Sequence, residues 1–252
     1  MRLLKNWRLR RTPFHRTYPS RSDFVMDHVD RRMAVDRERG FIYFRIPKAA
    51  NSTICYRLAR QKNSRIDNAD DAKRSFLRGS DLTGDEVAHL EERFFLFTFV
   101  RDPYARIASA YLDKVARLKG RQSAVLAGYQ QRSSEPMTFL EFCRYLDANG
   151  VYADPHWFPQ VVFVPLPVQQ LDFVGRVERF ESDYAALAAS IHDGAVDAPS
   201  DTWDPHRTQA QDQLANVYCP ESLDIVRRLY AVDFETFRYG DTPSWSAVGR
   251  DS

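Results

Sequence analysis

The chain has 252 residues, of which 44% are hydrophobic and 28% are charged, a composition typical of a folded globular protein. No apolar run approaches the ~18 residues that a transmembrane helix needs. The three cysteines (Cys55, Cys143 and Cys219) are odd in number, far apart and without a C-x-x-C spacing, which indicates neither a disulfide framework nor a metal cluster. We therefore expect a reducing, cytoplasmic location, and because no H-E-x-x-H spacing occurs we predict no metal.

The first 22 residues form a basic leader with one lysine, six arginines and no acid. The whole chain carries a net charge of +2, so the remainder is mildly acidic, and we predict that residues 23–252 form a single domain. The leader lacks the apolar core of a signal peptide. A solvated basic tail is the interpretation we favour, while a peripheral contact to an anionic membrane or a polyanionic acceptor stays open. We predict no nucleic-acid partner.

The stretch from Phe41 to Leu58 predicts a buried strand, a tight turn and a helix. Five of the six residues at positions 41–46 are aromatic or β-branched, as in a strand covered on both faces, and Pro47 ends that strand. Three good N-cap residues follow at 51–53, so the helix begins there. Its first amides and Lys48 would stabilise an anion, which predicts a phosphate or sulfate site. An ordinary strand-to-helix turn with a surface lysine is the alternative.

A second apolar strand, within Phe94–Val100, leads into another capped helix, in which Asp102 is the expected N-cap and a proline follows it. Arg101 at the end of the strand and Ser109 two turns into the helix are left to face a ligand. Parallel strands bind ligands beyond their carboxyl ends, so we expect Arg101 to lie near Lys48. Two anion sites on neighbouring strand ends suggest a ligand with two separated phosphates. A well-capped core helix without a binding role is the alternative.

These two stretches resemble the nucleotide motifs of the carbohydrate sulfotransferases. Residues 47–53 match the phosphosulfate loop P-K-x-[GA]-x-[ST]-[ST], in which many members have glycine at the position of Ala50. Arg101 and Ser109 match the residues that hold the 3′-phosphate, inside V-R-D-P-[FY]-x-R-[IL]-x-S-A-Y. Arg106 matches a recurrent arginine of that motif, for which a helix-surface ion pair is an equally good explanation. Weaker matches extend the resemblance over roughly residues 40 to 240, including an H-W-x-P segment within residues 154–160.

The resemblance implies an α/β fold with a central parallel β-sheet flanked by helices, like that of P-loop NTPases. It implies transfer of a sulfuryl group from 3′-phosphoadenosine-5′-phosphosulfate to a hydroxyl or amine of a saccharide or another hydroxylated acceptor. The residues that it assigns to the nucleotide come from both motifs: Lys48, Ala49, Ala50, Asn51, Ser52, Thr53, Arg101 and Ser109. Two rival functions stay open, a nucleotide-dependent kinase with an unusual loop and a non-catalytic relative that binds a polyanion.

Two catalytic residues are predicted. Lys48 would stabilise the charge that develops on the leaving phosphate oxygen. His156, in the H-W-x-P segment, is our choice of general base, although a purely structural histidine beside Trp157 would explain the same residues. His89 and Glu91 are the reserve candidates. Residues 119–136 are polar and without a clear period, and we expect them to form a loop near the acceptor site.

Overall fold

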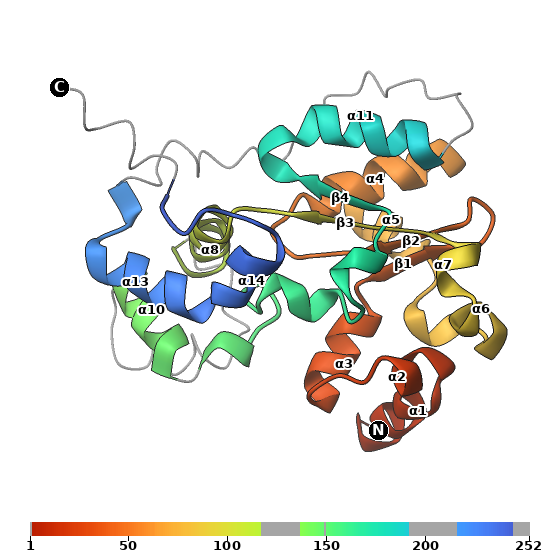
Figure 1. Cartoon of the computed structure of the whole chain (residues 1–252), viewed down its shortest axis with the longest axis horizontal. Helices are drawn as coiled ribbons and strands as arrows, with labels where there is room; N and C mark the ends of the chain where they lie inside the picture. The colour runs from red at the N-terminus through yellow and green to blue at the C-terminus, as the bar shows by residue number, and fades with distance from the viewer. Residues whose placement is uncertain (1, 117–136, 149, 192–215, 244–252) are drawn as a thin grey trace. The chain divides into compact units, whose positions relative to one another are not determined.

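The computed structural model describes residues 2–116, 137–148, 150–191 and 216–243 (Figure 1). The chain divides into two compact units, Met1–Val100 with Val162–Asp204 and Arg101–Val161 with Pro205–Ser252. None of the helices in the described ranges is long and apolar enough to cross a membrane. The expected loop at 119–136 lies outside the described residues, and a single domain over residues 23–252 stays a prediction.

The first unit contains a mixed β-sheet whose described strands run in the order β1-β2-β3-β4. They are β1 (Met33–Asp36), β2 (Phe41–Phe44), β3 (Phe95–Val100) and β4 (Phe173–Arg176). The strands β2, β3 and β4 pair in parallel, and β1 pairs antiparallel with β2. The predicted α/β sheet is confirmed. The edge strand β1 was not predicted, because four residues within a charged stretch show no usable alternation.

Helices flank this sheet, and Figure 1 shows α4 and α11 together on one side of it. The helices of the unit are α1 (Arg2–Arg11), α2 (Pro13–Thr17), α3 (Asp23–Asp30), α4 (Asn51–Lys62), α5 (Ala69–Arg74), α6 (Gly84–Ala88), α7 (Leu90–Arg93) and α11 (Phe180–Ile191), with 3-10 turns at Gly79–Asp81, Val168–Gln170 and Val177–Arg179. On the α4 and α11 side, Ile54, Leu58 and Leu187 pack with strand residues such as Tyr43 and Phe97. This burial fixes α4, and with it the turn that precedes it, against the sheet.

The basic leader is folded over part of its length. The Phe14 side chain in α2 is fully buried. The neighbouring His15 Nε2 lies 3.2 Å from Asp30 Oδ1, and the same carboxylate oxygen accepts a 2.7 Å hydrogen bond from the backbone N–H of Ser80. The expectation of a solvated tail is therefore wrong for α2. The buried Phe14 side chain anchors α2 to the first unit. The arginine-rich composition of the leader did not indicate this burial.

The second unit is helical in its described part, and a cluster of buried aromatic side chains forms its core. Its helices are α8 (Pro103–Tyr111), α10 (Phe139–Ala148), α13 (Pro220–Leu229) and α14 (Ala231–Thr236), with a π-helical turn at Leu112–Ala116 and 3-10 turns at Gly150–Tyr152 and Gln160–Phe163. The core includes Tyr104, Phe142, Trp157 and Tyr230. The chain passes from β3 into this unit at Arg101, and it is back in the first unit from Val162, before β4 begins.

The predicted start of α8 is confirmed. Asp102 is its N-cap, with a carboxylate that accepts a 2.8 Å hydrogen bond from the Ala105 N–H, and Pro103 is its first residue.

Candidate functional site

The turn between β2 and α4 has a left-handed backbone at two residues that are not glycine. The φ angle is 68° at Lys48 and 54° at Ala50. This conformation costs an L-residue about 1–2 kcal/mol, and such strain is concentrated at ligand-binding turns, where the surroundings enforce it. Left-handed residues within a turn direct neighbouring N–H groups toward one point, which creates a concave site for an anion. Ala50 thus adopts a backbone conformation that glycine takes more easily, and glycine stands at this position in many of the proteins that the loop resembles.

Helix α4 begins at Asn51, as predicted, but its N-cap is Ala50 rather than one of the residues at 51–53. The Ala50 carbonyl accepts the first helical hydrogen bond, 3.0 Å from the Ile54 nitrogen, and its side chain caps nothing. The N–H groups of the first turn have no intrahelical acceptor, and they carry the positive end of the helix dipole. Ser52 and Thr53 place two half-buried hydroxyl residues in the same turn. The local structure therefore fits a phosphate or phosphosulfate group.

Beneath this helix start, Arg45 binds the backbone on two sides. Its guanidinium donates to the carbonyl oxygens of Arg31 at 2.8 Å and Lys73 at 3.3 Å. Cys55, in the first turns of α4, is fully buried, and burial raises the pKa of its thiol. The thiol therefore stays neutral and serves as a packing group rather than a nucleophile.

In the second unit, Arg101 and Ser109 are both buried, with exposed fractions of 8% and 1%. The Ser109 hydroxyl has no hydrogen-bond partner among the described residues. A buried hydroxyl without a hydrogen-bond partner costs about 1–3 kcal/mol. This cost favours binding of a ligand that accepts a hydrogen bond from the hydroxyl. This orphaned group stands at the position that the resemblance assigns to the 3′-phosphate. The nearness of Arg101 to Lys48 stays a prediction, because these residues belong to different units.

Arg106 does not form the helix-surface ion pair considered as an alternative. It is fully buried, and its guanidinium donates to the carbonyl oxygens of Phe158 at 2.8 Å and His156 at 3.4 Å. Burial lowers the pKa of this guanidinium, and the charge of Asp233 opposes that effect. Arg106 therefore holds the backbone of the H-W-x-P segment, a structural task that requires a planar group with several donors.

His156 is oriented by a carboxylate. Its Nδ1 lies 2.6 Å from Asp154 Oδ1, which also accepts a 2.8 Å hydrogen bond from the backbone N–H of His156. Because a carboxylate accepts, the proton of the neutral ring resides on Nδ1, and Nε2 is the basic nitrogen. Trp157 has the structural role in this segment, since it is buried and donates from Nε1 to the Gly150 carbonyl at 2.9 Å. His156 is half-buried and has the arrangement of an oriented base.

The reserve bases His89 and Glu91 lie at the opposite end of the parallel strands from the phosphate loop. They precede β3, whose first residue, Phe95, donates to the carbonyl of Gly40 just before β2. Both residues are therefore near the amino ends of these strands, whereas Lys48 follows the carboxyl end of β2. A six-residue strand spans about 20 Å. Glu91 also accepts a 2.6 Å hydrogen bond from the side chain of Gln170.

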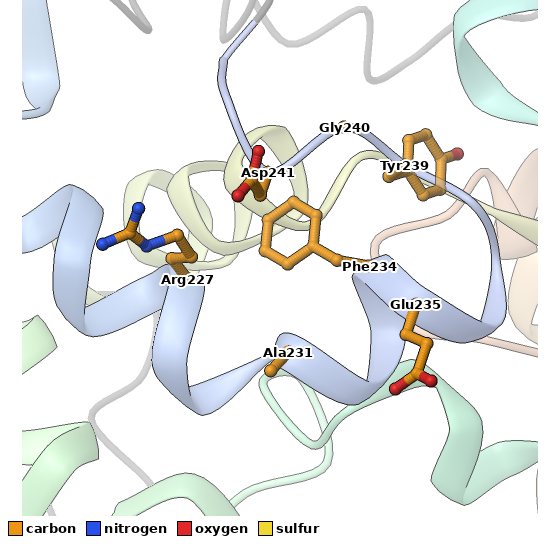
Figure 2. A pocket seen from close by; sticks show the side chains of 7 residues that line it. All are labelled: Arg227, Ala231, Phe234, Glu235, Tyr239, Gly240 and Asp241. Atoms are coloured by element: carbon orange, nitrogen blue, oxygen red, sulfur yellow. The ribbon is translucent and has the colours of Figure 1, made fainter.

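An open hollow of about 480 Å³ lies in the second unit, and Figure 2 shows the residues that line it. The side chains that line it come from the end of α13, from α14 and from the segment after α14: Arg227, Ala231, Phe234, Glu235, Tyr239, Gly240 and Asp241. No predicted nucleotide residue lines this hollow. The chemistry of the loop, rather than the hollow, therefore identifies the candidate site. Within the described residues, no group of three or more His, Cys, Asp or Glu side chains could hold a metal ion.

The sequence matches a known family over most of its length. The family model described as "Sulfotransferase family" matches residues 31–240. The chain belongs to the sulfotransferase family. Membership implies the P-loop-like fold that the first two motifs predicted, and it confirms the resemblance.

Three curated relatives to which this chain is similar are carbohydrate sulfotransferases. Carbohydrate sulfotransferase 14 of Danio rerio is 28% identical over 88% of this chain and 64% of its own length. The Mus musculus protein of the same name is 29% identical over 81% of this chain and 58% of its own. Carbohydrate sulfotransferase 8 of Mus musculus is 28% identical over 71% and 47%. The chain thus spans about half to two thirds of the length of these relatives, and no solved structure matches it significantly.

Sequence reasoning missed three residues that organise this site. Asp154 stands two residues before His156, a spacing at which aspartate often binds a backbone N–H, so the sequence did contain a signal for it. Gln160 and Asp233 had no such signal. They bind backbone groups that are 59 and 73 residues away in the chain, respectively.

Proposed function

We propose that this sulfotransferase transfers a sulfuryl group from 3′-phosphoadenosine-5′-phosphosulfate to a hydroxyl, or an amine, of a saccharide. The observation that carries the proposal is the strained turn at Lys48 and Ala50, which precedes a helix start without a side-chain cap. In a chain of this family, such a turn supports binding of the phosphosulfate. The names of the relatives, carbohydrate sulfotransferases 14 and 8, support a saccharide acceptor.

In this mechanism the first-turn amides of α4, with Ser52 and Thr53, hold the 5′-phosphate. The sulfur–oxygen bond to that phosphate breaks, its electron pair remains on the phosphate oxygen, and the acceptor oxygen forms the new bond to sulfur. Negative charge therefore develops on the leaving oxygen. A fixed cation at that oxygen binds the transition state more strongly than the ground state, and this is the role of Lys48.

Arg101 and Ser109 bind the 3′-phosphate in the same proposal. An arginine binds phosphate through charge-assisted hydrogen bonds, and a phosphate oxygen would accept from the buried Ser109 hydroxyl, which has no acceptor among the described residues. This contact distinguishes the sulfuryl donor from nucleotides that lack a 3′-phosphate, such as ATP.

His156 accepts the proton of the acceptor hydroxyl at Nε2, while Asp154 holds the ring and stabilises the imidazolium that forms. No metal takes part in the proposed reaction.

The test is release of 3′,5′-adenosine bisphosphate from the sulfuryl donor in the presence of a panel of unsulfated oligosaccharides. Lys48→Ala should lower turnover by about 10²-fold or more, the scale of losing one transition-state donor. Lys73→Ala is the control, because Lys73 is a lysine of the same unit that pairs with Asp70 on α5. If Lys48→Ala weakens donor binding but leaves turnover intact, Lys48 serves binding alone. Nucleotide binding without turnover on any saccharide would favour a non-catalytic polyanion-binding protein.

A further inference from the structure

The side chain of Gln160 forms two hydrogen bonds with the backbone of a single residue, Arg101. Gln160 Oε1 accepts from the Arg101 N–H at 2.9 Å, and Gln160 Nε2 donates to the Arg101 carbonyl at 2.8 Å. Gln160 is fully buried and Arg101 nearly so, which makes both bonds hard to replace with water. The side-chain amide thus binds the N–H and the carbonyl on the two sides of the Arg101 Cα atom, as a residue of a neighbouring antiparallel strand would.

Gln160 is itself held in place. Its backbone N–H donates to Asp233 Oδ2 at 2.7 Å, and the N–H of Val161 donates to Asp233 Oδ1 at 3.1 Å. Asp233 is fully buried in α14. Three residues before Val161, the Phe158 carbonyl is bound by Arg106 from α8. The segment that carries Gln160 is therefore fixed by side chains from two helices, and it can fix Arg101 in turn.

Arg101 needs such support because of its place in the chain. It lies after β3 ends at Val100 and before α8 begins at Pro103, so its backbone belongs to neither element. Fixing only one of its backbone groups would leave its Cα–Cβ direction able to rotate. Fixing the N–H and the carbonyl together sets that direction. Charge-assisted hydrogen bonds between arginine and phosphate depend on direction as well as distance.

We propose that Gln160 is a positioning residue for Arg101 and that it determines how strongly the protein prefers nucleotides with a 3′-phosphate. Gln160 does not touch the nucleotide in this proposal; it acts through the backbone of Arg101. The inference rests on the proposed function, in which Arg101 reads the 3′-phosphate. It assigns to Gln160 an effect on ligand selectivity that a purely structural residue would not have.

The test compares Gln160→Met with the wild type by isothermal titration of 3′,5′-adenosine bisphosphate and of 5′-AMP. Methionine fills nearly the same space but forms neither hydrogen bond. We expect the bisphosphate to bind about tenfold more weakly, because without the two hydrogen bonds Arg101 must be ordered when the 3′-phosphate binds. Binding of 5′-AMP should stay unchanged. The preference for the 3′-phosphate therefore falls about tenfold.

Ser222→Ala is the matched control. The Ser222 hydroxyl is fully buried in the same unit and also forms two bonds with the backbone of one residue, accepting from the Cys219 N–H and donating to its carbonyl, each at 2.9 Å. Its loss should lower the melting temperature of the free protein without changing the ratio of the two affinities. If Gln160→Met does not fold, Gln160→Asn replaces it, because asparagine keeps an uncharged amide but is one methylene too short to reach both backbone groups of Arg101.

The outcomes separate the two proposals. A wild type that binds 5′-AMP as tightly as the bisphosphate overturns the proposed role of Arg101, and the inference with it. A wild type that prefers the bisphosphate, together with a folded Gln160 variant that keeps the full preference, overturns the inference alone. An equal loss of preference in Ser222→Ala also overturns it, because general loosening of the unit would then suffice. Loss of preference only in the Gln160 variant supports it.

Discussion

The strained phosphate loop makes a specific prediction about Ala50. Replacing Ala50 with glycine removes the steric cost of a left-handed L-residue, about 1–2 kcal/mol. Two effects oppose this gain: glycine is more flexible in the unfolded chain, by about 0.4–1 kcal/mol, and part of one methyl group is no longer packed, at up to ~0.8 kcal/mol if it were fully buried. These terms leave a range from about 0.8 kcal/mol less stable to about 1.6 kcal/mol more stable, and their midpoints predict that Ala50→Gly is about 0.4 kcal/mol more stable than the wild type.

Urea denaturation followed by circular dichroism measures this change, with Ala185→Gly as the control. Ala185 is exposed in the middle of α11 and has a helical backbone, so glycine there should cost about 1 kcal/mol. Ala50→Val completes the series, because a β-branched residue tolerates the left-handed region worst, and it should unfold at the lowest urea concentration. In the loop itself, Ala50→Gly should keep its affinity for 3′,5′-adenosine bisphosphate.

A particular result would refute this reasoning. If Ala50→Gly loses as much stability as Ala185→Gly, the Ala50 backbone is not strained. The argument that strain in this turn serves anion binding would then be withdrawn, whatever the effect on nucleotide affinity.

Two further predictions concern the proposed base and the response to acid. Asp154→Asn and His156→Ala should each lower turnover by about 10²-fold or more, while binding of 3′,5′-adenosine bisphosphate persists. A stopped assay measures the turnover and calorimetry measures the binding. Loss of nucleotide binding would instead indicate a structural role for these residues. The hydrogen bonds from Arg37 lower the pKa of Glu86 to about 2, so this carboxylate stabilises the folded state above pH ~4.5, and the contribution is lost as the pH falls toward 2. Glu86→Gln should therefore flatten the decline of the melting temperature between pH 4.5 and 2, and an unchanged acid profile would contradict it.

The sequence predicted those features that depend on neighbouring residues. The strand–turn–helix order around Lys48 follows from an apolar run, a proline and a helix start, all within eighteen residues. The cap at Asp102 could be read in the same way, because an N-cap binds an N–H three residues on. Family membership confirms that these local patterns belong to a sulfotransferase.

The remaining features depend on contacts between distant residues. Gln160 bonds to Arg101 across 59 positions, and no periodicity reveals which backbone group a buried amide will bind. Arg106 was open to two explanations because the sequence does not show whether a helical arginine faces solvent or the core. The burial of Phe14 was hidden in the same way by its basic surroundings. The cytoplasmic location expected from the cysteines stays a prediction.

The central claim is that this sulfotransferase binds a nucleotide carrying both a 5′-phosphate and a 3′-phosphate. The most direct measurement is the shift in melting temperature of the wild-type protein with equal, saturating concentrations of 3′,5′-adenosine bisphosphate, 5′-AMP and ATP. A ligand that binds only the folded state raises the melting temperature in proportion to the logarithm of its concentration over its dissociation constant. We predict the largest shift with the bisphosphate and small shifts with 5′-AMP and ATP. Equal shifts with the bisphosphate and 5′-AMP, or a larger shift with ATP, would contradict the account, the latter in favour of a kinase.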